Sequence, residues 1–162
     1  KVKFIKDANF LLLITTTGYK DFDLLENQLN FALELNLPLV CSNPDIYGIL
    51  GNKIHKSTGN IAVRYKEKGG IAYIIGKPGI EAFEYIVDLS ISKNKKEILM
   101  IGDSLFNDIA GANNFGIDSL LIKSGIHRSH FSKKEDHENI IRGIKSNYQT
   151  TGKPTYIIDK LI

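Results

Sequence analysis

Short apolar runs alternate with amphipathic stretches along the first part of the chain. Residues 10–18 are rich in β-forming side chains and end at Gly18, which predicts a buried strand. Residues 21–35 then place leucines at helical spacing behind an acidic residue, Asp21 or Asp23, that can cap a helix. Residues 37–45 return to a short strand that closes in a turn. This order predicts a β-α-β unit, in which a helix connects two parallel strands.

The alternation continues through the second part of the chain and weakens after His127. Strands that alternate with helices indicate an α/β fold with a mostly parallel sheet. The pair Gly69-Gly70 is the best candidate for a domain boundary, which divides the chain into residues 1–70 and 71–162. The further predicted elements are a helix over 59–70, a strand over 71–79, a helix over 80–90, a strand over 96–103, a helix over 107–116, a strand over 117–125, a polar loop with a short helix over 130–149 and an apolar segment over 154–162.

Composition and charge narrow the class of protein. Of the 162 residues, 43% are hydrophobic and 24% are charged, and the net charge of +3 comes from dispersed basic residues. Neither nucleic acid nor membrane is indicated as a partner, and no apolar run approaches the roughly 20 residues of a membrane-spanning helix. Cys41 is the only cysteine, so no internal disulfide can form. We therefore predict a cytoplasmic protein.

Two predicted strands end in a charged residue that directly follows a glycine. These residues are Lys77 and Asp103, and Asp108 lies on the same loop as Asp103. Because ligands bind beyond the carboxyl ends of the strands in open parallel sheets, we expect Lys77 and Asp103 to converge from adjacent strand tips. A lysine suits a phosphate, and two carboxylates suit Mg²⁺, which takes oxygen ligands and keeps several waters. The alternative is that the aspartate caps a helix and Lys77 is a solvated surface residue.

Four motifs together resemble a known family. They are "NPD" (43–45), "IIGKPG" (74–79), "MIGDSLFNDIAGANNFGI" (100–117) and "SGIH" (124–127). In this order and spacing, over about residues 10–127, the chain is similar to haloacid-dehalogenase (HAD)-type hydrolases, most of all to the class IIA branch. The resemblance implies a Rossmann-like core with a smaller α/β cap. Residues 1–70 then correspond to the later part of the cap, and residues 71–162 to the later part of the core.

The resemblance also implies a role for each motif residue at the reaction centre. Lys77 is expected to neutralise the substrate phosphate, and Asp103 to bind Mg²⁺. Asp108 is expected to hold the waters of the metal or to orient Lys77. Asn107 stands where the family usually has threonine, a departure that keeps a helix cap.

The remaining motif residues are expected to select the substrate. Asn43 and Asp45 are expected near the interface between cap and core, where a small phosphorylated metabolite is chosen. His127 is expected either to contact the substrate or its phosphate, or to lie on a surface loop. Class IIA relatives often dimerise through the cap, so a homodimer is one expected assembly.

The nucleophile of the family is one of the motif elements that this sequence lacks, and its second-motif serine or threonine has no candidate either. In the family it is the first residue of an Asp-x-Asp-Gly motif, whereas Asp21 and Asp23 open a leucine-rich helix and no glycine follows them. The chain starts at Lys1 and its only methionine is Met100, so we expect a piece of a longer protein. We expect this piece to be inactive without a segment or partner that supplies the missing strands. The alternative is a non-catalytic, split or truncated binding or assembly unit.

Overall fold

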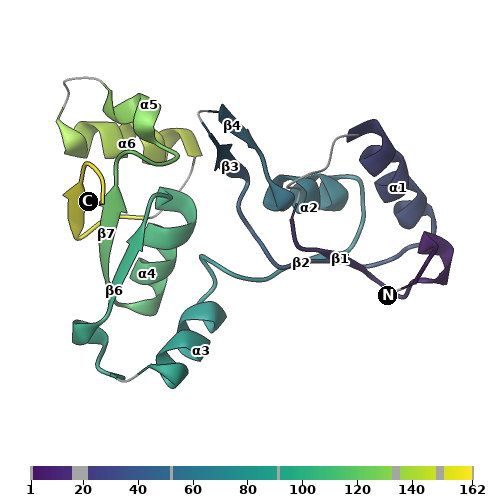
Figure 1. Cartoon of the computed structure of the whole chain (residues 1–162), viewed down its shortest axis with the longest axis horizontal. Helices are drawn as coiled ribbons and strands as arrows, with labels where there is room; N and C mark the ends of the chain where they lie inside the picture. The colour runs from purple at the N-terminus through teal and green to yellow at the C-terminus, as the bar shows by residue number, and fades with distance from the viewer. Residues whose placement is uncertain are drawn as a thin grey trace. The chain divides into compact units, whose positions relative to one another are not determined.

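The computed structural model describes residues 2–15, 22–51, 53–90, 92–132, 136–148 and 152–161. The chain forms two compact units, Lys1–Ile75 and Gly76–Ile162, and each contains a three-stranded parallel sheet with helices (Figure 1). The predicted α/β class with parallel sheets is therefore confirmed. None of the helices in the described ranges combines the length and the apolar character needed to cross a membrane.

The first unit is built around the predicted β-α-β order, which is confirmed. Its parallel sheet has the strand order β1-β2-β5, and Leu12, Val40 and Tyr73 lie side by side in register. The predicted strand end at Gly18 and the cap at Asp21 lie outside the described residues. The elements are a 3₁₀ turn (Ile5–Asp7), β1 (Leu11–Leu13), α1 (Phe22–Glu34), β2 (Leu39–Cys41), β3 (Tyr47–Leu50), β4 (Lys53–Lys56), α2 (Thr58–Glu67) and β5 (Ala72–Ile74).

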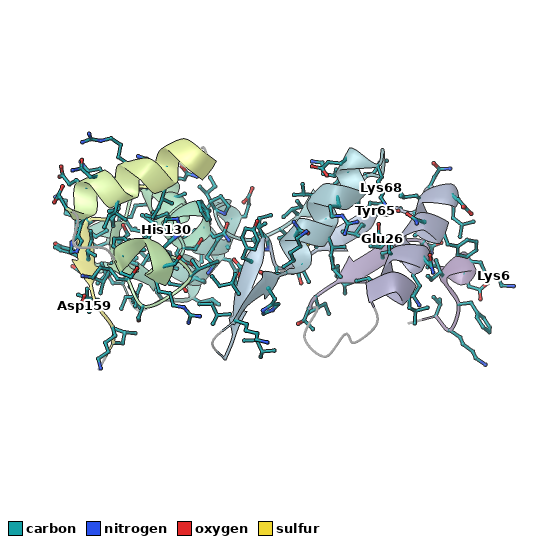
Figure 2. The ribbon with its side chains drawn as sticks, turned by 90° about the horizontal axis from the view of Figure 1, so that it is seen from above. Lys6, Glu26, Tyr65, Lys68, His130 and Asp159 are labelled. Atoms are coloured by element: carbon teal, nitrogen blue, oxygen red, sulfur yellow. The ribbon has the colours of Figure 1, made fainter. Side chains whose placement is uncertain are left out.

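Both helices of the first unit pack on the same core as the sheet. Buried side chains come from α1, β2 and α2, namely Ala32, Leu39, Cys41, Ala62 and Tyr65. Glu26 of α1 also pairs with Arg64 of α2 and with Lys68, which directly follows α2. Figure 2 labels Glu26 and Lys68. These cations keep the pKa of Glu26 below its usual value, chiefly through the Lys68 hydrogen bond. The side chains of Leu12 and Tyr73, in contrast, are more than half exposed.

Two clusters of apolar side chains form the core of the second unit. The strand order is β6-β7-β8, and Lys123 after β7 pairs with Asp159 after β8 at 2.5 Å. One cluster joins Leu121 to buried isoleucines of α6, and the other joins Phe83 of α3 to Phe115 of α4. The elements are α3 (Glu81–Leu89), a 3₁₀ turn (Lys95–Glu97), β6 (Leu99–Gly102), a π-helical turn (Leu105–Ile109), α4 (Ala110–Phe115), β7 (Asp118–Ile122), α5 (Arg128–Phe131), α6 (His137–Tyr148) and β8 (Tyr156–Ile158).

The strand that precedes Lys77 differs from its prediction. β5 pairs with β2 of the first unit, and β6 has only β7 as a strand neighbour among the described residues. The prediction that Lys77 and Asp103 follow neighbouring strands is therefore wrong. Lys77 instead lies in a turn closed by the Gly79 amide and the Gly76 carbonyl oxygen at 2.9 Å, and the two units divide just before this turn, not at Gly69-Gly70.

Replacement of a buried leucine should destabilise the chain far more than replacement of an exposed one. Leu121 is fully buried, whereas Leu89 is 71% exposed. We expect Leu121→Ala to lower the free energy of unfolding by about 2–5 kcal/mol, because it removes buried methyl groups and leaves a cavity. Leu89→Ala should change it by less than about 0.5 kcal/mol. Urea unfolding followed by circular dichroism measures both, and similar losses would contradict the described core.

Candidate functional site

Asp108 forms the centre of the site at the carboxyl end of β6. Its Oδ2 accepts hydrogen bonds from the backbone amides of Asp103 and Ser104, each at 3.1 Å. Its Oδ1 accepts from Nζ of Lys77 at 2.5 Å. The Asp108 side chain is only 6% exposed and that of Lys77 is 38% exposed. The structure therefore brings Lys77, Asp103 and Asp108 together within the second unit.

The loop that carries both aspartates is shaped by its own hydrogen bonds. Ser104 caps the π-helical turn, because its hydroxyl oxygen accepts from the Asn107 amide at 3.2 Å. The Ile109 amide then donates to the Ser104 carbonyl oxygen at 3.0 Å. Wide helical turns of this kind are rare and are found often at functional sites.

Two glycines make the close packing of the aspartates possible. A Cβ atom at Gly102 would lie 2.3 Å from the Cβ of Asp108, and one at Gly125 would lie 2.1 Å from the Cβ of Asp103. Real Cβ atoms do not approach so closely, so only glycine, which has no side chain, fits at these two positions. Gly102 thus lets Asp108 fold back over the strand end, and Gly125 lets a second segment lie against Asp103.

The carboxylate of Asp103 is held on one side only. Its Oδ2 accepts a hydrogen bond from the Ile126 amide at 2.9 Å. Its Oδ1 has no hydrogen-bond partner among the described residues, and the side chain is partly exposed. Asp103 is thus the aspartate with an oxygen available to a ligand, whereas both oxygens of Asp108 already accept hydrogen bonds.

The aspartate carboxylates at this site are the kind of ligand that Mg²⁺ prefers, although they are few. Carboxylate oxygens are the ligands that Mg²⁺ prefers, and one or two can suffice because the ion keeps several waters. Within the described ranges no three His, Cys, Asp or Glu side chains gather as a metal cage. The residues present therefore fit a site in which Asp103 holds the ion and Asp108 orients Lys77, one of the two roles predicted for Asp108.

His127 lies inside the fold. It is 2% exposed, its Nε2 accepts a hydrogen bond from the Leu105 amide at 3.1 Å, and its ring stands edge-on to Phe106 at 5.0 Å. Burial, and the neighbouring His130 to a smaller degree, lower the pKa of His127 to about 4. The structure shows a supporting contact to the loop, and contact with substrate stays a prediction.

Asn43 and Asp45 lie in the first unit, apart from the other predicted site residues in sequence and in unit. The Asn43 side-chain oxygen accepts from the Asp45 amide at 3.0 Å, and the Asn43 carbonyl oxygen accepts from the Thr58 hydroxyl at 2.8 Å. Both residues therefore shape the turn between β2 and the β3–β4 hairpin. Their part in substrate selection stays a prediction.

Residues 74–161 match the family model described as HAD-hydrolase-like. This match covers Lys77, Asp103, Asp108 and His127, whereas Asn43 and Asp45 lie before it. The chain belongs to the HAD-hydrolase-like family. The predicted resemblance to HAD-type hydrolases is thereby confirmed.

The sequence of the chain is also similar to those of known phosphatases. The chain is 29% identical over 125 residues to dihydroxyacetone phosphatase of Corynebacterium glutamicum (strain R), an alignment that covers 75% of this chain and 44% of that protein. It is 33% identical over 57 residues to phospholysine phosphohistidine inorganic pyrophosphate phosphatase of Danio rerio, covering 35% of this chain and 21% of that protein. The chain thus spans less than half the length of these relatives.

Solved structures agree with the fold. A HAD-like hydrolase of Brucella suis 1330 superposes with a TM-score of 0.71 at 26% identity, over 100% of this chain and 59% of that one. A possible sugar phosphatase of the HAD superfamily from Cytophaga hutchinsonii gives 0.69 at 27% identity, over 96% and 53% of the two chains. The p-nitrophenyl phosphatase of Archaeoglobus fulgidus gives 0.65 at 20% identity, over 96% and 55%, and shows the fold alone. Such neighbours are in keeping with the class IIA branch.

The site residues that the sequence did not mark either carry no charge or act through the backbone. Ser104 and Gly125 stand inside quoted motifs but carry no charge, and the amide of Ile126 contributes without its side chain. The glycine before Asp103 was a usable signal, because it predicted close approach at that strand end. No comparable signal in the sequence marks the amide of Ile126 or the acceptor role of His127.

A methyl group at Gly125 should disturb the site. We expect Gly125→Ala to lower the free energy of unfolding by about 1–3 kcal/mol, because its Cβ would overlap Asp103. Gly143→Ala is the matched control, since Gly143 lies in α6 and a Cβ there meets no atom within 4 Å. That substitution should stabilise the chain by up to about 1 kcal/mol, because alanine favours helix. Urea unfolding measures both, and equal effects would contradict the packing at Asp103.

The burial of His127 should make stability depend on pH. Because the pKa is about 4 in the folded chain and 6.5 in the reference state, the unfolded chain binds more protons between these values. The contribution of the neutral His127 ring to the free energy of unfolding is therefore fully present above pH 6.5 and is lost as the pH falls towards 4. Between pH 7 and 4 the unfolding free energy should fall by about 3 kcal/mol more for the wild type than for His127→Gln. Urea unfolding across this range measures the difference, and parallel pH profiles would contradict it.

Proposed function

We propose that this chain carries the lysine and metal-ligand part of a Mg²⁺-dependent HAD-type phosphomonoester hydrolase. The observation that carries the proposal is the ion pair of Lys77 with buried Asp108, beside the half-free carboxylate of Asp103. Family membership and the phosphatases among the relatives support it. The proposed substrate is a small phosphorylated metabolite, and the proposed setting is the cytoplasm.

Each site residue has a distinct task in this proposal. The Lys77 ammonium neutralises the charge of the substrate phosphate while its pairing with Asp108 holds the Nζ atom in place. Asp103 supplies a carboxylate oxygen for the metal. Mg²⁺, when bound, would neutralise negative charge that develops on the transferring phosphoryl group. The site thus offers positioning and charge neutralisation, which are the main requirements of phosphoryl transfer.

We propose that the nucleophile comes from outside these 162 residues, since they contain no Asp-x-Asp-Gly motif. We propose that the strand that carries this nucleophile adds to the sheet at the outer edge of β6. β6 pairs only with β7 among the described residues. Leu99 and Ile101, which share one face of β6, are also 43% and 45% exposed. Parallel strands end at the same edge of a sheet, so a further parallel strand here would end near Asp103. An unpaired apolar edge is otherwise a liability.

We expect phosphatase activity to require both Mg²⁺ and an added strand. The assay uses p-nitrophenyl phosphate, dihydroxyacetone phosphate and sugar phosphates, with and without a polypeptide that carries an Asp-x-Asp-Gly strand. Asp103→Asn should lower the Mg²⁺ affinity of the chain at least about tenfold by calorimetric titration, because it removes a charged oxygen ligand. Asp88→Asn, at an exposed position on α3, should leave that affinity unchanged.

The outcomes separate the two proposed functions. Turnover by the chain alone would contradict the need for an added strand. Absence of both Mg²⁺ binding and turnover, even with that strand, would favour a non-catalytic binding or assembly unit, for which the exposed apolar face of β6 would be the interaction surface.

A further inference from the structure

Two segments far apart in the sequence exchange hydrogen bonds at the site. The Ile126 amide donates to Oδ2 of Asp103 at 2.9 Å, and the Leu105 amide donates to Nε2 of His127 at 3.1 Å. The loop that begins at Asp103 therefore accepts a hydrogen bond from residue 126 and donates one to residue 127. Such reciprocal bonds fix the register of one segment against the other.

The surroundings of His127 leave its ring one role in this exchange. The ring is buried and packs edge-on to Phe106, and Leu105 is fully buried beside it. A nitrogen that accepts a backbone N–H bears no proton, so the proton of the neutral ring is on Nδ1. The Leu105 amide would lose its acceptor if the ring lost Nε2, and an unpaired buried amide is costly.

Asp103 depends on the same register. Gly125 approaches so closely that a Cβ there would lie 2.2 Å from Oδ2 of Asp103. A small shift of residues 125–127 along the loop would therefore break the bond from Ile126 or push against the carboxylate. The hydrogen bond between Leu105 and His127 opposes that shift. It therefore also preserves the bond from the Ile126 amide to Oδ2 of Asp103, which leaves Oδ1 of Asp103 for a ligand.

We infer that His127 is a positioning residue for Asp103, and that it acts as the hydrogen-bond acceptor of the Leu105 amide. Its effect on the metal rests on the proposed function, whereas its effect on the loop does not. The partners that hold metal ligands commonly affect metal affinity 10–100-fold when they are removed. His127 would act here at one further step, through the backbone of the segment that holds Asp103.

Two substitutions separate the acceptor of His127 from its ring. His127→Phe keeps a ring beside Phe106 and has no acceptor, whereas His127→Gln places an oxygen near the position of Nε2 and has no ring. We expect amide exchange of Leu105 and Ile126, measured by NMR without metal, to become at least about tenfold faster in His127→Phe. In His127→Gln it should stay within about threefold of the wild type. The opposite ranking, or equal loss in both variants, would overturn the inference.

Metal binding provides the second measurement. The Mg²⁺ affinity should fall about tenfold or more in His127→Phe and stay close to the wild type in His127→Gln. Faster exchange with unchanged Mg²⁺ affinity would overturn the role in positioning Asp103. If the wild type binds no Mg²⁺, the proposed function fails, and amide exchange alone decides whether His127 holds the loop.

The wild-type chain gives a third measurement that needs no substitution. The ¹⁵N resonances of the His127 ring should show a proton on Nδ1 and none on Nε2. A proton on Nε2 would exclude the acceptor role and overturn the inference even where both variants fail to fold.

Discussion

The site depends on one buried carboxylate and the donors that surround it. Asp108 accepts two backbone amides on Oδ2 and the Lys77 ammonium on Oδ1, while its side chain is almost fully removed from water. An isolated carboxylate at such a depth is strongly disfavoured unless charge and hydrogen bonds compensate it. These three donors come from two chain segments, and their convergence brings a cation to the end of β6.

Several local features follow from that requirement. Gly102 must lack a side chain because Asp108 folds back over the strand end. The turn of residues 105–109 widens so that Asp108 reaches the amides of Asp103 and Ser104. The ion pair is weak evidence for stability, because the cost of desolvating the charges offsets much of their attraction. Its clearest consequence is geometric, since it fixes the Lys77 ammonium beside Asp103.

The sequence predicted the members of this cluster better than the path by which they meet. Glycine followed by a charged residue at the end of an apolar run marked Lys77 and Asp103, because that pattern places a charge at a sheet edge. It could not show that β5 pairs with β2, since a short apolar run suits either sheet. The β3–β4 hairpin was missed for a related reason. Its side chains are mostly exposed, so no apolar alternation marks it, although Gly51-Asn52 is a turn signal.

The contacts that complete the site lay beyond prediction because they use backbone atoms. Ile126 donates through its amide, and any residue except proline could do so. His127 carries a side chain that usually suggests catalysis, yet here it accepts a backbone amide. Lys77, Asp103, Asp108 and His127 all belong to the second unit, whereas Asn43 and Asp45 belong to the first. The ion pair and hydrogen bonds given above for Lys77, Asp103 and Asp108 join residues of the second unit.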